Sequence, residues 1–210
     1  MTSQSVRERC CCHLEMPTKR LELLYAAARA FAEQGFDSAN INEIATQAGL
    51  GKGTVYLYFA NKKALYLGVI EYTVTYFNNV ADHIMALPVS NWEKIEQVVH
   101  TFLTLDEEFI PFLTLWARHQ FHHATEFQED MAQIFSRLRQ PLCEIVAAGV
   151  EQGEFHTEYP ETMGYVILSL LAMLVPELQV PYGMPAIPRD QRSTLALDVI
   201  RKILGVNLEP

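Results

Sequence analysis

Two clusters of side chains in this 210-residue sequence have the chemistry to bind a metal ion. His119, His122 and His123 fall within five residues, and the first and last of them would share one face of a helix. Cys10–Cys12 supply three consecutive thiols near the amino terminus. Imidazole nitrogen and thiolate sulfur are ligands that zinc and related ions prefer. These clusters leave open a metal-responsive or thiol-responsive regulator and, beyond it, a metal-dependent hydrolase.

Neither cluster comes with the rest of a working site. The histidine spacing brings no assured fourth ligand, and the sequence offers no convincing pairing of nucleophile and base of the kind that a hydrolase needs. Adjacent cysteines cannot easily bridge one another, and chain ends are usually mobile. We therefore expect no cofactor, no bound metal and no enzymatic activity, with the histidines serving as surface or pocket side chains.

The strongest pattern lies in NINEIATQAGLGKGTVYLYFANKK, residues 40–63. Asn40 is a good N-cap, and the apolar residues that follow at helical spacing predict a short helix that Gly49 ends. After a three-residue turn, Lys52 opens a second helix of about two turns. Two short helices joined by a glycine-containing turn are the helix-turn-helix signature, whose second helix enters the DNA major groove.

The side chains around this second helix suit contacts with DNA. Gly51 and Gly53 leave room for a phosphate at the helix amino terminus, where backbone amides favour an anion. Lysines and hydroxyl groups suit the sugar-phosphate backbone, whereas Leu57 could only touch an apolar base edge such as a thymine methyl. The candidate DNA-binding residues are Lys19, Asn40, Lys52, Gly53, Thr54, Tyr56, Leu57, Tyr58 and Lys62.

The string GFDSANINEIATQAGLGKGTVYLYFANKKAL resembles the DNA-binding signature of the tetracycline-repressor-like (TetR) transcriptional regulators. Two positions depart from the family pattern. Asn40 replaces the usual Thr or Ser and keeps the cap, and Gly51 replaces the usual Ser and loses a phosphate contact. The resemblance implies a repressor released from a palindromic operator in double-stranded DNA by a small-molecule effector of hydrophobic or aromatic character.

Charge and hydropathy agree with this interpretation. The formal net charge is −9, but residues 1–66 hold eight Lys/Arg against six Asp/Glu, and residues 67–210 hold eight against nineteen. The acidic excess thus lies outside the predicted head, as expected when only one end meets phosphate. No run reaches the roughly twenty apolar residues that span a bilayer, and the first fifteen residues lack the apolar centre of a signal peptide. We expect a cytoplasmic protein.

The whole sequence predicts an all-α fold of about nine helices. We expect a flexible N-terminal arm in 1–16, a three-helix DNA-binding domain in 17–63, and a ligand-sensing and dimerisation domain in 64–210. In the last of these, helices are predicted over 61–87, 91–105, 106–123, 126–152, 160–178 and 189–204, with Pro141 kinking or breaking the fourth. Three prolines in VPYGMPAIP predict an extended loop before the final helix.

Two functional surfaces are expected in the C-terminal domain. Aromatic residues with few charges predict an apolar ligand cavity, or simply a core. The candidate ligand-binding residues are Phe102, Phe109, Phe112, Trp116, His119, His123 and Tyr165. The helix over 160–178 is apolar nearly all round and must be covered on every side. The family resemblance implies that the last two helices form a dimer interface, with Leu168, Ala172, Leu195, Val199 and Ile203 as candidates, and a monomer is the alternative.

Overall fold

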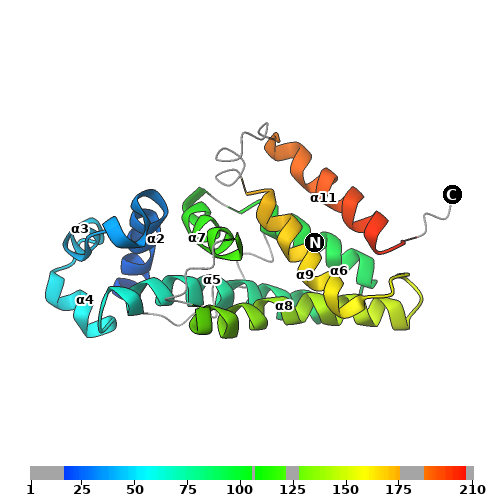
Figure 1. The fold of residues 1–210 in the computed structure, drawn as a ribbon, viewed down its shortest axis with the longest axis horizontal. Coiled ribbons are helices and arrows are strands. Elements are labelled where there is room, and N and C mark those ends of the chain that lie inside the picture. The colour runs from blue at the N-terminus through cyan, green and yellow to red at the C-terminus, as the bar shows by residue number, and fades with distance from the viewer. Residues whose placement is uncertain (1–16, 106, 122–127, 176–186, 207–210) are drawn as a thin grey trace.

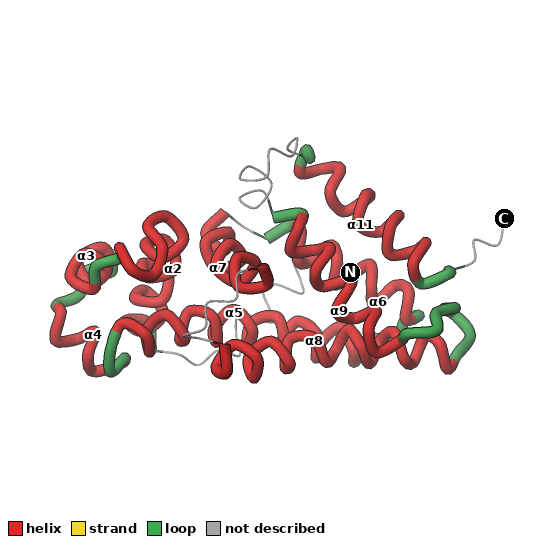
Figure 2. The backbone as a smooth tube through the Cα atoms, viewed as in Figure 1, coloured by secondary structure: helices red, strands yellow, loops and turns green. Residues whose placement is uncertain are grey.

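The computed structural model describes residues 17–105, 107–121, 128–175 and 187–206, and over these residues the chain is helical, without strands (Figure 1). The all-α class with an N-terminal helix-turn-helix head, predicted from the sequence, is confirmed. Figure 2 shows the helices joined by loops. The elements are α2 (Thr18–Ser38), α3 (Ile41–Gln47), α4 (Lys52–Tyr58), α5 (Lys62–Met85), α6 (Asn91–Leu103), the 3₁₀ turn η1 (Glu107–Phe109), α7 (Ile110–Phe121), α8 (Gln128–Glu151), α9 (Pro160–Met173) and α11 (Arg189–Ile203).

The head consists of α2, α3 and α4 at one end of the molecule (Figure 1). Helix α2 packs against α3 within the head and against α5 and α7 of the remainder. Helix α5 starts at the head, where the Asn61 side chain accepts a hydrogen bond from the Ala64 amide at 2.8 Å. Its 24 residues make a rod of about 36 Å that continues into the C-terminal domain.

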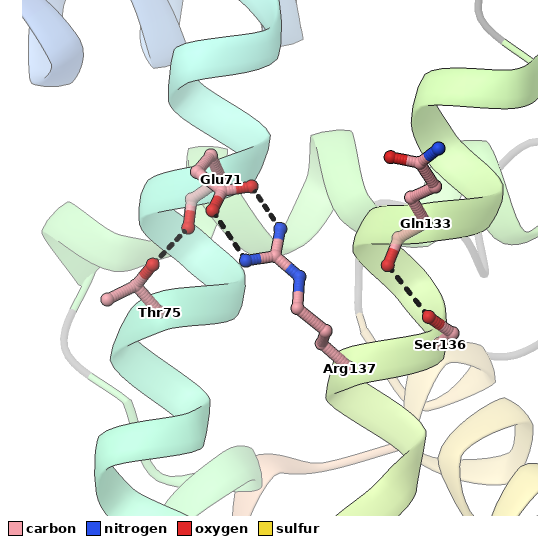
Figure 3. A network of polar contacts seen from close by, with 5 residues as sticks. All are labelled: Glu71, Thr75, Gln133, Ser136 and Arg137. Atoms are coloured by element: carbon pink, nitrogen blue, oxygen red, sulfur yellow. Dashed lines mark hydrogen bonds and ion pairs between the residues drawn. The ribbon is translucent and has the colours of Figure 1, made fainter.

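Helix α8 lies alongside α5 and runs in the same direction. Lys63 pairs with Asp130 at 3.0 Å near the start of both helices, and further along Arg137 of α8 donates two hydrogen bonds to the Glu71 carboxylate of α5, at 2.8 and 2.5 Å (Figure 3). These side chains are roughly half exposed, so the pairs fix the register of the two helices more than they stabilise the fold. Helix α9 packs on α8, and α11 covers α6 and α9.

Three predicted boundaries need correction or refinement. Of the two effects expected at Pro141, a kink or a break, the break does not occur, because α8 continues through that residue from Gln128 to Glu151. An interior proline costs about 3 kcal/mol, and packing against α5, α6 and α9 outweighs it here. The helix predicted over 106–123 begins as the turn η1, and the helix predicted to reach residue 178 ends at Met173. None of the described helices is both long and apolar enough to cross a membrane.

Candidate DNA-binding and effector sites

The turn between α3 and α4 is built by local capping. The Asn40 side chain accepts a hydrogen bond from the Asn42 amide at 2.8 Å and so starts α3. Gly49, with φ of 66°, ends it: its amide donates to the Thr46 carbonyl, and the Leu50 amide donates to the Ala45 carbonyl at 2.8 Å. This pair of bonds is the Schellman arrangement, which requires a left-handed residue that glycine adopts without strain.

Helix α4 presents most of its surface to solvent. Of its seven residues only Val55 is buried, and Lys52, Gly53, Tyr56 and Leu57 are exposed. Leu57 is 83% exposed, although it carries one of the most apolar side chains of the head. An apolar side chain that projects from a helix into solvent is unfavourably hydrated, and it is suited to cover an apolar base edge.

The other candidate DNA contacts fall into two groups. Lys19 is exposed in the first turn of α2, whereas Thr54 and Tyr58 are partly buried. Lys62 has a structural role that its sequence position did not indicate. Its ammonium donates to the Asp37 carbonyl at 2.8 Å and lies 5.0 Å from the Phe36 ring centroid, so it ties the start of α5 to the end of α2.

Gly68 joins the head to α5 by close packing. A Cβ atom at this position would lie 2.5 Å from Cε1 of the buried Phe59, the residue that directly follows α4. Only a glycine lets the Phe59 ring approach the α5 backbone this closely. Sequence reasoning missed Gly68, because a glycine inside a helix gives no local sign of the ring that rests on it.

Four of the candidate ligand aromatics lie in one buried cluster. Phe102, Phe109, Phe112 and Trp116 are almost fully buried and pack ring to ring, with centroids 4.9 Å apart for Phe109 and Phe112 and 5.3 Å for Phe102 and Trp116. Of these four, Phe102 also borders cavities. The cluster is therefore part of the buried core, and Phe102 is its member at the cavity walls.

Tyr165 lies apart from this cluster. It is about half exposed on α9 and borders an open groove with Cys143, Arg139 and Glu161. Burial raises the pKa of the Cys143 thiol above its ordinary value, so the group stays protonated and donates to the Glu161 carbonyl at 3.2 Å. This groove thus offers a weak hydrogen-bonding thiol and no thiolate.

Neither metal cluster can be placed. Cys10–Cys12, His122 and His123 lie outside the described residues, and nothing is shown of the His119 side chain. Among the residues that the structure does describe, no three His, Cys, Asp or Glu side chains come together as metal ligands would.

A cavity of about 170 Å³ lies between the ends of α6 and α9 and the starts of α7 and α11. Its walls are apolar apart from Glu107, Arg189 and Arg192. The Arg189 guanidinium donates to the Leu105 carbonyl at 2.6 Å, which brings together residues 84 positions apart. The two arginines were not among the candidates from sequence, because no local pattern connects the start of α11 to the end of α6.

Some candidate interface residues are buried within the protomer, and the others are at least partly exposed on its surface. Leu168 and Ala172 of α9 are buried within the protomer, since this face of α9 packs against its own domain, so they cannot form a surface for a partner. Leu195 of α11 is 40% exposed, and Val199 and Ile203 are partly exposed. The exposed face of α9 instead carries other side chains, Tyr165 and Val166.

A helix-turn-helix head joined to an all-helical C-terminal domain defines a DNA-binding transcriptional regulator. The family model for bacterial regulatory proteins of the tetR family matches residues 23–69. The chain is 25% identical over 155 residues to the transcriptional repressor NicS of Pseudomonas putida, with 72% of this chain and 73% of that protein covered. It is also 25% identical over 138 residues to a fatty acid metabolism regulator of Bacillus subtilis, with 65% and 70% covered. Residues 23–69 thus carry the DNA-binding domain of the tetR family.

Solved structures share the fold over nearly the whole chain. The fatty acid degradation regulator FadR of Bacillus halodurans superposes with a TM-score of 0.74 at 20% identity, covering 91% of this chain and 97% of that one. FadR of Bacillus subtilis, solved in complex with stearoyl-CoA, gives a TM-score of 0.74 at 19% identity and covers 89% and 99%. The relatives named here are transcriptional regulators rather than enzymes.

Proposed function

We propose that this protein is a homodimeric repressor, without catalysis of its own, that binds a palindromic operator in the cytoplasm and leaves it when a small molecule binds the C-terminal domain. NicS is named a repressor, and regulators of the same fold have been solved with stearoyl-CoA and with triclosan. These findings support repression and an apolar effector.

The observation that carries the proposal is the exposure of Tyr56 and Leu57 on α4. They are the two large apolar side chains of the head that are exposed among the described residues, and they are neighbours on the second helix of the helix-turn-helix. Lys52 stands at the amino end of the same helix. The second helix of a helix-turn-helix lies in the major groove, so we assign its exposed apolar pair, Tyr56 and Leu57, to the groove and Lys52 to phosphate.

Dimerisation is proposed through α9 and α11. Tyr165, Val166 and Leu195 are large apolar side chains that stay exposed on these two helices. A two-fold dimer would cover them and would place two heads on one face of the duplex, which is why the operator should be palindromic.

The proposed domain division at residues 63 and 64 separates two functions rather than two rigid bodies. Helix α2 of the head packs on α7, and Phe59 rests on Gly68, so both sides of the division share contacts. An effector that binds better to one arrangement of α5 and α7 would therefore shift the position of the head, and the difference in affinity between the two states sets the response.

The test is selection of bound duplexes from a random pool by the purified full-length protein, followed by binding titrations at several salt concentrations. We expect a palindromic motif, an affinity that falls steeply with salt, and a loss of about 1–3 kcal/mol in Leu57→Ala confined to specific duplexes. Lys52→Ala should weaken specific and non-specific DNA alike. The matched control is Val89→Ala, an exposed apolar residue outside the head. Selection of no motif at low salt would overturn the proposal.

A further inference from the structure

The 170 Å³ cavity at the start of α11 is large enough for a small organic molecule. Its apolar wall is formed by Phe102, Leu103, Leu105, Leu113, Leu174 and Val175. An apolar protein cavity of about 150 Å³ is known to take up benzene, so this one has room for about six to eight carbon atoms. It is smaller than the roughly 300–1,000 Å³ of sites for drug-sized ligands.

Positive charge is concentrated at the same cavity. Arg189 and Arg192 border it, and the carboxylate among its described lining residues is the exposed Glu107. This is unusual for its surroundings, because residues 67–210 contain only eight Lys/Arg against nineteen Asp/Glu. Two of those eight cations are thus found at a single apolar cavity.

The two guanidinium groups are held in place by backbone bonds. Arg189 donates to the Leu105 carbonyl at 2.6 Å, and the Nε atom of Arg192 donates to the Ile187 carbonyl at 2.9 Å. A guanidinium has five N–H donors in a fixed fork, so the bond to Leu105 orients Arg189 without using up its capacity. Paired forks of this kind match the geometry of a carboxylate.

From these observations we propose that the cavity binds a small monocarboxylic acid, with its carboxylate on Arg189 and Arg192 and an apolar body of about six to eight carbons against Phe102. The inference names the chemical class of the effector and so rests on the function proposed above. Two arginines against one glutamate favour an anion over a neutral or cationic ligand of the same size.

Phe102 gives the bound acid a route to the head. Its ring lies 5.0 Å from that of Phe77, and Phe77 in turn contacts Phe109 at 6.0 Å. Phe109 stacks on Phe112, which meets Tyr25 of α2 at 4.9 Å. Phe102 also borders a second apolar cavity of about 40 Å³, which gives the ring space to move when the first cavity fills.

The experiment titrates the full-length protein, without DNA, with octanoate and with 1-octanol by calorimetry. The two ligands share the same chain and differ in charge, so we expect octanoate to bind at least about tenfold more tightly. Arg189→Gln and Arg192→Gln should each remove about tenfold of octanoate affinity and leave 1-octanol unchanged. Arg201→Gln is the matched control, since Arg201 lies on the same helix but pairs with Glu96 and borders no part of the cavity.

Two further ligands test which chain length the cavity accepts and whether the acid is recognised free or as a thioester. Palmitate should bind more weakly than octanoate to the natural protein, and Phe102→Ala should shift the preference toward the longer acid. Octanoyl-CoA tests whether the acid is recognised free or as a thioester. Equal affinity for octanoate and 1-octanol, no loss in either arginine variant while thermal unfolding stays normal, or tighter binding of octanoyl-CoA than of octanoate would each overturn the inference.

Operator binding is measured in a separate experiment, so a failure of the cavity assignment can be distinguished from a failure of the proposed function. If octanoate does not bind but the protein still selects a palindromic duplex, the cavity assignment is wrong and the regulator stands. If octanoate binds as expected but leaves operator affinity unchanged at saturation, the cavity is a binding site that is not the effector site, which overturns the effector role assigned here.

Discussion

The ring of Tyr25, on the first helix of the DNA-binding head, meets the ring of Phe112 on α7 nearly edge to face, with centroids 4.9 Å apart and 75° between the planes. Tyr25 also lies 6.3 Å from Tyr72 of α5. Through these two contacts the head rests on both a connecting helix and a helix of the C-terminal domain. The position of the head is therefore set by packing as well as by the covalent link through α5.

We predict that Tyr25 and Phe112 are energetically coupled. Edge-to-face aromatic pairs contribute about 0.5–1.5 kcal/mol beyond the area that they bury. A double-mutant cycle with Tyr25→Leu and Phe112→Leu, followed by urea unfolding, should therefore give a coupling energy in this range. A parallel cycle with Tyr25→Leu and Phe155→Leu should be additive, because the Phe155 ring packs on Gly149 near the end of α8. A coupling energy near zero for the first pair would show that the contact does not hold the head.

Gly68→Ala should destabilise the protein, although alanine is normally the better helix former. The new Cβ would lie 2.5 Å from the Phe59 ring, and relieving such a clash costs about 1–3 kcal/mol. Gly53→Ala is the matched control for stability, because Gly53 is also helical and has open space around its Cβ position. That change should stabilise the protein by up to about 1 kcal/mol. Urea unfolding measures the change in the free energy of unfolding for each variant. A change of the same sign in both would contradict the prediction.

Gly164→Ala should separate α8 from α9. A Cβ atom at Gly164 would lie 2.5 Å from the Cys143 sulfur and 2.7 Å from the Cys143 backbone nitrogen. We expect a loss of unfolding free energy of about 1–3 kcal/mol. Cys143→Ala removes the sulfur but leaves the backbone nitrogen in place, so Gly164→Ala should remain destabilising in that background. Full rescue by Cys143→Ala would show that only the side chain was in the way.

Leu195→Glu should convert the proposed dimer into a monomer. A charge placed in the proposed apolar interface would be buried without a partner, which costs several kcal/mol. Sedimentation equilibrium of the variant should give the mass of one chain, while Val89→Glu, at an exposed apolar residue in the loop between α5 and α6, should keep the natural mass. The natural protein sedimenting as a monomer at micromolar concentration would refute the interface itself.

The start of α6 should contribute stability that depends on pH. The Ser90 hydroxyl donates to the Glu93 carboxylate at 2.7 Å and the Ser90 amide donates at 3.0 Å, and these bonds hold the pKa of Glu93 below its ordinary value of 4.5. A lowered carboxyl pKa stabilises the fold above the unfolded pKa, and the contribution is lost as pH falls through the folded pKa. Ser90→Ala should therefore reduce the unfolding temperature more at pH 7 than at pH 3. An equal reduction at both would mean that Glu93 has no part in it.

The sequence was enough for the head because its signals are local. Asn40 caps the helix that it precedes, and Gly49 supplies the left-handed residue that ends it. Capping and turn chemistry act within about four residues, so they can be read without knowing what packs on them. The helices of the C-terminal domain followed from apolar spacing in the same way, apart from their ends and the effect of Pro141.

Only the tertiary structure decided which apolar faces are covered and which distant residues meet. Helix α9 is apolar nearly all round, so periodicity gave no way to see that Leu168 faces its own core and Tyr165 faces solvent. Likewise, Arg189 and Leu105 are joined by a hydrogen bond across 84 residues, and the cavity between them exists only because α11 folds back over α6. The hydrophobic effect is non-directional. The sequence therefore shows that an apolar helix face must be buried, whereas the packing of the whole chain determines which element buries it.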